Sequence, residues 1–131
     1  MSAEETMRVA MADVPKALAA GLVDMGSGMM LAIKTVDSHP QSVLDILAPA
    51  TKEMFEGDMV IEIENLFKQA RGVESDERYF KEILISSTHL WHYFGRLKSN
   101  SQVVLAVVTR GDVNLGLFVM KARQIIDTAT V

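Results

Sequence analysis

The sequence predicts an α/β (α+β) fold, a three-layer α-β-α sandwich on a five-stranded, mostly antiparallel sheet. Two apolar runs, 17–24 and 29–36, flank the turn Met25-Gly26-Ser27-Gly28, which is the pattern of a β-hairpin. Residues 103–108 are an unbroken aliphatic run, typical of a central strand covered on both faces. Around these runs, apolar residues recur at helical spacing, which predicts helices on the sheet.

A helix is predicted at each end of the chain. Ser2 and Glu5 have the spacing of a capping box, and Pro15 interrupts the helical pattern that follows them. Asn114 is a suitable N-cap for a last helix. The apolar positions of that last helix are Leu115, Phe118, Ala122 and Ile125.

A long middle helix is predicted over residues 40–71. Ser42 and Asp45 are in capping-box register near its start, and Gly72 is a natural helix stop. Pro49 leaves two alternatives, a kink in one helix or the start of a second, because an interior proline removes a backbone hydrogen bond.

The middle helix carries an unusually wide apolar arc. One stripe contains Val43, Leu47, Ala50, Met54 and Ile61, and its neighbour contains Met59, Ile63, Leu66 and Ala70. The sheet of a small monomer covers one side of such a helix, so the second side indicates another subunit or a partner.

Two further strands are expected before the central run. Residues 79–88 alternate, with Ile83 and Ile85 on one face, and residues 89–98 form the next strand. The predicted order is α-β-β-α-β-β-β-α, in one domain spanning residues 1–131.

Composition and charge disfavour several classes of function. The 131 residues are 49% hydrophobic with a net charge of −4, which fits a globular chain and disfavours nucleic acid as a partner. The sequence has no cysteine, an acidic start and no apolar run long enough for a bilayer, so we expect a cytoplasmic protein with no membrane span.

No catalytic, cofactor or metal site is predicted. His89 and His92 lie three apart on a strand and therefore point to opposite faces. Gly26-Ser27-Gly28 lacks a following phosphate-binding helix, and Arg110-Gly111-Asp112 is interpreted as a turn. His39 is assigned to a loop. The acidic residues Glu53, Glu56, Asp58, Glu62 and Glu64 are interpreted as a solvated helix face.

Two alternatives to a non-enzymatic module remain open. The aromatic residues Trp91, Tyr93 and Phe94 share one predicted strand, and a profilin-like or PAS-like sensor would hold a small molecule near the first two. An enzyme using the acidic helix, with Glu62 as the test residue, is the least favoured because no nucleophile and base can be assembled from spacing.

Two segments resemble the roadblock/dynein light-chain family. The first is Ala20-Gly21-Leu22-Val23-Asp24 with Gly28-Met29-Met30-Leu31-Ala32, similar to the family's first hairpin. The second is the run 103–108 with Asn114-Leu115-Gly116-Leu117, similar to its last strand and last helix. The resemblance covers nearly the whole chain in element order.

The resemblance implies a dimer in which the middle helix and the following strand pair across a twofold axis. Residues expected near the contact are Met54, Ile61, Tyr79, Phe80 and Ile83. It also implies a scaffold or regulator of a Ras-like small GTPase or another NTPase, working as a homodimer or heterodimer without cofactors. The residues themselves support the dimer but indicate no GTPase.

Overall fold

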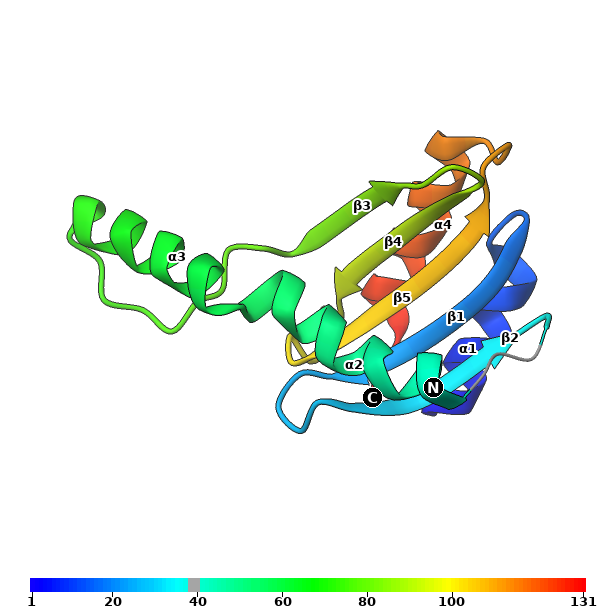
Figure 1. Ribbon diagram of the computed structural model, residues 1–131, viewed down its shortest axis with the longest axis horizontal. Helices are drawn as coiled ribbons and strands as arrows, with labels where there is room; N and C mark the ends of the chain where they lie inside the picture. The colour runs from blue at the N-terminus through cyan, green and yellow to red at the C-terminus, as the bar shows by residue number, and fades with distance from the viewer. Residues whose placement is uncertain (38–40) are drawn as a thin grey trace.

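The computed structural model describes residues 1–37 and 41–131, with backbone only for 41–45. It contains a five-stranded antiparallel sheet in the order β2-β1-β5-β4-β3 (Figure 1). The elements are α1 (Ala3–Asp13), β1 (Ala17–Asp24), β2 (Met29–Thr35), α2 (Gln41–Glu56), α3 (Asp58–Arg71), β3 (Glu82–Ser86), β4 (Leu90–Arg96), β5 (Val103–Arg110) and α4 (Leu115–Thr128). This confirms the predicted fold class. The predictions for His39, Val43, Ser42 and Asp45 lie outside the described side chains.

The aliphatic run 103–108 lies in the middle of the sheet, as predicted. Its strand β5 pairs with β1 on one side and β4 on the other, so that Val107 stands beside both Ala20 and Tyr93. Strands β2 and β3 are the two edges. Val103, Val104, Leu105 and Val107 are buried, whereas Ala106 and Val108 are only half-buried.

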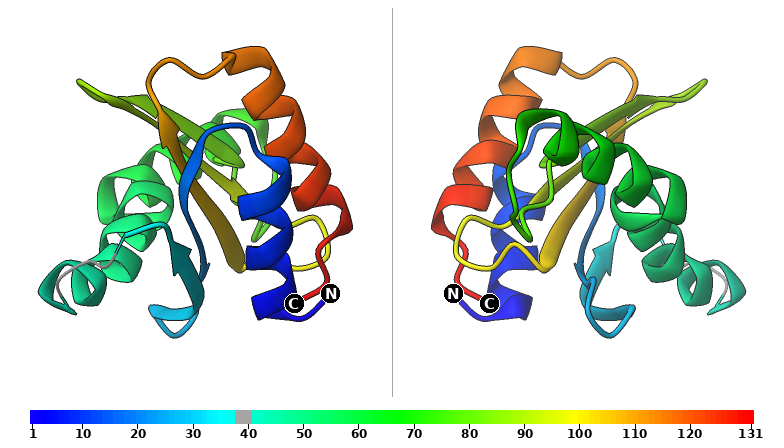
Figure 2. Two further views of the ribbon diagram at one scale, coloured as in Figure 1. Left: turned by 90° about the vertical axis from the view of Figure 1, so that its right-hand side faces the viewer. Right: turned by 90° about the vertical axis from the view of Figure 1, so that its left-hand side faces the viewer.

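Helices α1 and α4 lie side by side on one face of the sheet (Figure 2). Met7 of α1 and Phe118 of α4 are buried against this face with Leu22, Tyr93 and Leu105 of the strands. This layer contains the larger of the two buried apolar clusters. Both predicted N-caps are confirmed: the Ser2 side chain accepts a hydrogen bond from Glu5 N at 3.1 Å, and Asn114 accepts one from Leu117 N at 3.0 Å.

Helix α2 lies on the opposite face and covers only part of it. Phe55 and Ala48 of α2 are buried against Val23, Met25 and Val104. The remainder of this face, toward the start of β4 and the end of β5, is left without a helix (Figure 1). The second apolar cluster is therefore small, and the third layer of the sandwich is incomplete.

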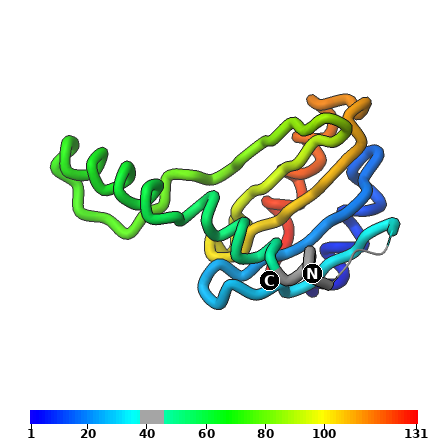
Figure 3. The backbone as a smooth tube through the Cα atoms, in the orientation of Figure 1, coloured from blue at the N-terminus to red at the C-terminus, as the bar shows by residue number. Residues whose placement is uncertain are grey.

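The predicted middle helix is divided at Gly57 rather than at Pro49. Pro49 lies inside α2, whereas Gly57 adopts an extended conformation (φ −62°, ψ 159°) and is the N-cap of α3. A side chain has no room at Gly57, because an added Cβ would lie 2.6 Å from the Glu53 carbonyl oxygen. From this break α3 continues past the β3 edge of the sheet (Figure 3) and ends, as predicted, at Gly72 in the left-handed conformation.

Strand β3 is shorter than the predicted 79–88. Only Glu82–Ser86 pairs regularly with β4, from Glu82 beside Gly95 to Ser86 beside Trp91. Upstream, a hydrogen bond from Arg96 N to Lys81 O continues the contact without forming a ladder. Among the described residues, no helix is both long and apolar enough to cross a membrane.

Candidate protein-interaction surface

Helix α3 exposes apolar side chains and buries charged ones. Met59, Ile63, Leu66 and Phe67 are between 44% and 69% exposed, and their spacing places them on one side of the helix. We call these four residues the α3 ridge. On the other side, Glu64 and Lys68 are only 1% and 6% exposed. This is the reverse of a surface helix, which turns its apolar side inward.

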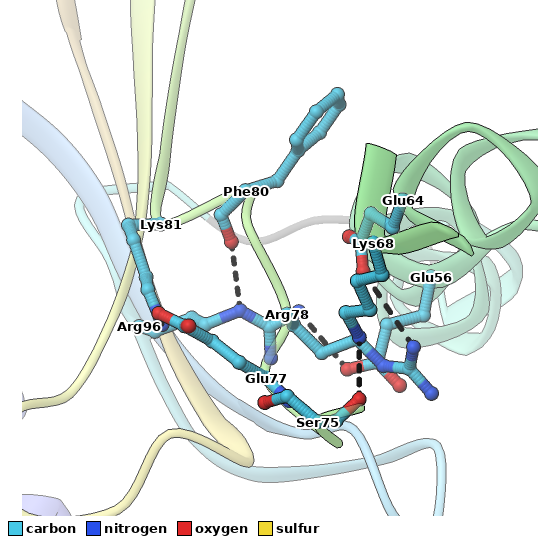
Figure 4. A network of polar contacts seen from close by, with 9 residues as sticks. All are labelled: Glu56, Glu64, Lys68, Ser75, Glu77, Arg78, Phe80, Lys81 and Arg96. Carbon is cyan, nitrogen blue, oxygen red and sulfur yellow. Dashed lines mark hydrogen bonds and ion pairs between the residues drawn. The ribbon is translucent and has the colours of Figure 1, made fainter. Parts of the chain in front are cut away.

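The chain from Gly72 to Lys81, the 72–81 connection, covers the charged side of α3. The Lys68 ammonium donates a hydrogen bond to Ser75 O at 2.9 Å and lies 5.5 Å from the centre of the Tyr79 ring. Arg78 Nη1 lies 3.5 Å from the Glu64 carboxylate (Figure 4). Buried charges need partners of this kind. The 72–81 connection therefore fixes the orientation of α3 and directs its apolar side outward.

A second buried charged residue, Arg96, lies close to the junction of α2 and α3 and binds three neighbouring segments. Arg96 of β4 forms an ion pair with Glu56 at 3.0 Å and donates hydrogen bonds to Phe80 O at 2.8 Å and Ser101 O at 2.7 Å. Its guanidinium also lies 5.1 Å from the Phe55 ring centre. The end of α2, the 72–81 connection and the sheet are thereby joined at one point.

The prediction of a wholly solvated acidic helix face is wrong for two of its members. Glu53, Asp58 and Glu62 are exposed as expected, but Glu56 is mostly buried and Glu64 almost completely so. Their partners Arg78 and Arg96 are far away in the sequence. Helical spacing describes one helix and carries no information about a distant arginine, which is why the sequence did not separate these residues.

The β3 edge adds to the exposed apolar surface. β3 has a strand neighbour on one side only, so its outer backbone groups have no partner within the sheet. Leu84 and Ile85 on this strand and Phe80 just before it are exposed. An apolar edge strand of this kind is a template for pairing with another chain.

A groove occupies the part of the sheet that α2 leaves uncovered. Its floor includes Ala19 and Ala106, the Met30 side chain lies over Gly21 at one side, and the hollow has a volume of about 320 Å³. Leu47 of α2 and His92 of β4 are among the residues that line its walls. We call this hollow the front groove.

The front groove is not where the sensor alternative placed a ligand. Tyr93 is buried on the other face, with its ring centre 6.2 Å from that of Phe118, and Trp91 packs into the same cluster. Neighbouring residues of a strand point to opposite faces, so Phe94 alone of the three aromatic residues lines the groove. Neither Trp91 nor Tyr93, near which the prediction placed a ligand, lines the front groove.

The five predicted contact residues come from four adjoining segments. Met54 belongs to α2, Ile61 to α3 and Ile83 to β3, while Tyr79 and Phe80 belong to the 72–81 connection. Phe80 is exposed and the other four are half-buried. The sequence stripes included three residues of the α3 ridge but missed Phe67, although it follows Ile63 at helical spacing.

His89 lies in the turn between β3 and β4, outside the strand predicted for it, and His92 lies on β4. His92 Nε2 lies 3.1 Å from the Ser87 hydroxyl, and burial lowers the pKa of His92 below its usual value. In the described part of the chain, no three His, Cys, Asp or Glu residues are grouped as metal ligands.

In both tight-turn motifs, the aspartate side chain makes contacts that stabilise the turn. Asp24 accepts hydrogen bonds from Ser27 Oγ at 2.7 Å and Gly26 N at 3.3 Å, and the Ser27 hydroxyl is the main cause that lowers the pKa of Asp24. In the Arg110-Gly111-Asp112 turn, Asp112 forms ion pairs with Lys16 at 2.9 Å and Arg110 at 3.3 Å.

The arrangement of elements matches known structures. An MglB in a tetrameric arrangement superposes with a TM-score of 0.70 at 19% identity, covering 95% of this chain and 82% of that one. The gliding protein MglB from Thermus thermophilus gives 0.68 at 19% identity, with 95% and 83% covered. A Roadblock/LC7 domain from Streptomyces avermitilis gives 0.66 at 13% identity, with 96% and 92% covered.

The chain matches known proteins by its structure but not by its sequence. No known protein-family pattern matches the sequence, and no curated protein matches it significantly. The three structural matches span nearly the whole chain, which confirms at the level of the fold the resemblance first drawn from two short segments. The chain therefore has the roadblock/LC7 fold.

Proposed function

We propose that this chain is a single roadblock-like domain, a non-enzymatic dimeric scaffold or regulator that binds a Ras-like small GTPase or another NTPase in the cytoplasm. The observation that carries the proposal is the reversed polarity of α3, which exposes Leu66 and Phe67 while it buries Glu64 and Lys68. An exposed apolar stripe on a fixed helix is typical of a protein interface. The fold resemblance supplies the class of partner.

The proposed dimer pairs two β3 edges about a twofold axis. Such pairing would continue the sheet from one copy into the next and satisfy the outer backbone groups of β3. It would bring the predicted contact residues of both copies together. These residues are Met54, Ile61, Tyr79, Phe80 and Ile83. Tyr79, Phe80 and Ile83, which lie on or just before the exposed edge strand, support the proposal.

Light scattering tests the dimer. We expect twice the chain mass for the wild type and the single chain mass for Phe80→Glu, because a charge at a dry contact lacks solvation. Leu31→Glu is the matched control, since Leu31 is exposed on β2, which forms the opposite edge of the sheet. A wild type that stays monomeric at high concentration would contradict the proposal.

Nucleotide kinetics test the partner. Each Ras-like GTPase of the source organism would be purified, and its rates of GTP hydrolysis and nucleotide release measured with and without this protein. We expect one of them to change rate in the presence of the wild type. Unchanged rates and no binding for every GTPase would count against a GTPase partner and leave the dimer as a separate question.

A further inference from the structure

The edge of the sheet opposite β3 is formed by β2 and carries exposed apolar side chains. Leu31 and Ile33 on this strand are 42% and 39% exposed. In the described part of the chain, β2 has one strand neighbour, β1 (Figure 1). The backbone groups on its outer side are therefore open to another strand.

Ile33 and Thr35 carry the outward backbone groups. Val36 N donates a hydrogen bond to Leu18 O at 2.9 Å, so the backbone of Val36 points toward β1. Consecutive residues of an antiparallel ladder direct their backbone groups to opposite sides, which places those of Ile33 and Thr35 on the side away from β1. A strand added there would gain hydrogen bonds without disturbing the pairing of β1 with β2.

A hollow of about 520 Å³ lies beside this edge, between β2 and α1. A bulge in the β1–β2 pairing leaves Leu31 without a partner in β1, and Leu31 is among the residues that line the hollow. Ala32 and Lys34 stand on the α1 side of the sheet, because their β1 partners Leu22 and Ala20 are buried on that side. Side chains of an added strand that point to this side would enter the hollow.

The charges around the hollow are separated along the strand. Glu4 and Glu5 belong to the first turn of α1, which lies at the hairpin end of the sheet, near the start of β2 (Figure 2). Lys34 lies near the other end of β2, and Arg8 follows one turn beyond Glu4 on α1. The hollow therefore has an acidic end and a basic end.

We propose that residues 31–35 and this hollow, together the β2 site, bind an extended segment of a partner protein as an additional antiparallel strand. From its amino end, the segment would carry an acidic residue beside Lys34, an apolar residue over Leu31 and a basic residue near Glu4, at alternate positions. Alternate residues of a strand share a face, so all three side chains would enter the hollow. Opposite charges that face each other across strands stabilise the pairing.

A second copy of this chain fits the β2 site less well. Strand β2 contains Lys34 and no acidic residue, so a copy of β2 would offer Lys34 no acidic partner and would bring a second lysine toward it. The β2 site also lies at the opposite edge from the dimer contact proposed above. Both can therefore be occupied at once, and each can be tested without the other.

Two synthetic peptides test the charge arrangement. The Glu peptide is Thr-Glu-Thr-Val-Thr-Lys-Thr, and the Lys peptide, Thr-Lys-Thr-Val-Thr-Lys-Thr, has lysine in place of its glutamate. Each would be titrated into isotopically labelled protein while NMR follows the backbone amides. We expect the Glu peptide to shift the amides of Ile33 and Thr35 saturably, and to bind about threefold to tenfold more tightly than the Lys peptide. The net charge of −4 alone would favour the Lys peptide.

Charge reversal at Lys34 is the matched test. In Lys34→Glu the order of the two peptides should invert, because the first lysine of the Lys peptide then faces a carboxylate. An unchanged order in Lys34→Glu would overturn the proposed arrangement.

Two further variants test the strand pairing. Ile33→Pro should lose the peptide, since proline has no N–H and Ile33 directs its own outward, away from the β1–β2 hydrogen bonds. Ile33→Val keeps the N–H and is the control. Leu31→Glu leaves the backbone of β2 unchanged and should also lose the peptide. Light scattering of the same samples reports the dimer separately, so that loss of either interaction is distinguished from loss of the other.

Other results would overturn the β2 site itself. Amide shifts confined to β3 would place the added strand at the opposite edge. Shifts of Ile33 and Thr35 that grow with protein concentration in the absence of peptide would assign the edge to a second copy. A wild type that binds neither peptide at millimolar concentration would exclude strand addition at β2.

Discussion

Arg96 and Glu56 form a buried ion pair that joins the sheet to the end of α2. The Nη2 and Oε2 atoms are 3.0 Å apart, and the two side chains are 2% and 13% exposed. The same guanidinium donates to the carbonyl oxygens of Phe80 and Ser101. One side chain therefore connects α2, the 72–81 connection and the β4–β5 turn, and its loss should affect all three.

Replacing Arg96 by Leu should lower the free energy of unfolding by about 3–5 kcal/mol, because it leaves Glu56 buried without its cation. Urea denaturation would measure the loss. Arg110→Leu is the matched control, since its ion pair with Asp112 is well exposed and contributes about 1 kcal/mol at most. Equal losses in the two variants would show that the Arg96 pair is not buried in solution.

The Glu82 cluster should make stability depend on pH. Hydrogen bonding to Arg123, opposed by burial and aided by the Tyr93 hydroxyl, holds the pKa of Glu82 below its usual 4.5. A lowered folded-state pKa stabilises the fold above the unfolded-state pKa, and this contribution disappears as pH falls through the folded-state value. We expect wild type to be more stable than Glu82→Gln at pH 7, with the difference shrinking below about pH 4.5.

The comparison should be made by thermal unfolding across that pH range, with Glu77→Gln as the control because the Glu77–Lys81 pair is long and exposed. A difference in melting temperature between wild type and Glu82→Gln that stays constant down to the lowest pH would contradict the role given to Glu82. The contact itself is short, with the Tyr93 hydroxyl 2.5 Å from Glu82 Oε2 and both Arg123 bonds at 2.8 Å.

Gly57→Ala should destabilise the junction between α2 and α3 by about 1–3 kcal/mol, since the new methyl group would press on the Glu53 carbonyl. Chemical denaturation would detect it. Gly26→Ala is the control, because its added Cβ would have its nearest contact at 3.6 Å from the Asp24 carboxylate. A neutral Gly57→Ala would mean that α2 and α3 move apart freely at this point.

Removing the cap of α4 by Asn114→Ala should cost about 1 kcal/mol, because Leu117 N loses its acceptor. Asn114→Asp keeps an acceptor at the same place and should retain most of the stability. Melting temperatures of the three proteins measure the effect, and equal losses in both variants would argue against capping as the cause.

The parts of the fold predicted from sequence are those fixed by local pattern. The run 103–108 could occupy only a central strand, and Ser2 and Asn114 cap helices through bonds that span a few residues. The break at Gly57 was missed because Pro49 is the stronger local signal, yet the space at Gly57 is limited by the tertiary course of the chain. Helix propensities depend on the local sequence and therefore do not reveal a backbone contact of that kind.

The candidate surface was only partly predictable for the same reason. The wide apolar arc correctly indicated more exposed apolar surface than one sheet can cover. The sequence could not show which acidic residues turn inward, because Glu64 is buried through Arg78 and Glu56 through Arg96, and both arginines lie beyond the helix. The front groove likewise depends on Ala19 and Ala106, which lie on two paired strands distant in sequence.

The apolar character of the α3 ridge should make any association through it depend on temperature. Its four side chains offer a partner dispersion and burial but no charge, so covering them releases ordered water and has a negative heat capacity change. Burial of this type weakens on cooling. Any assembly that this ridge holds together should therefore come apart in the cold before the individual subunits unfold.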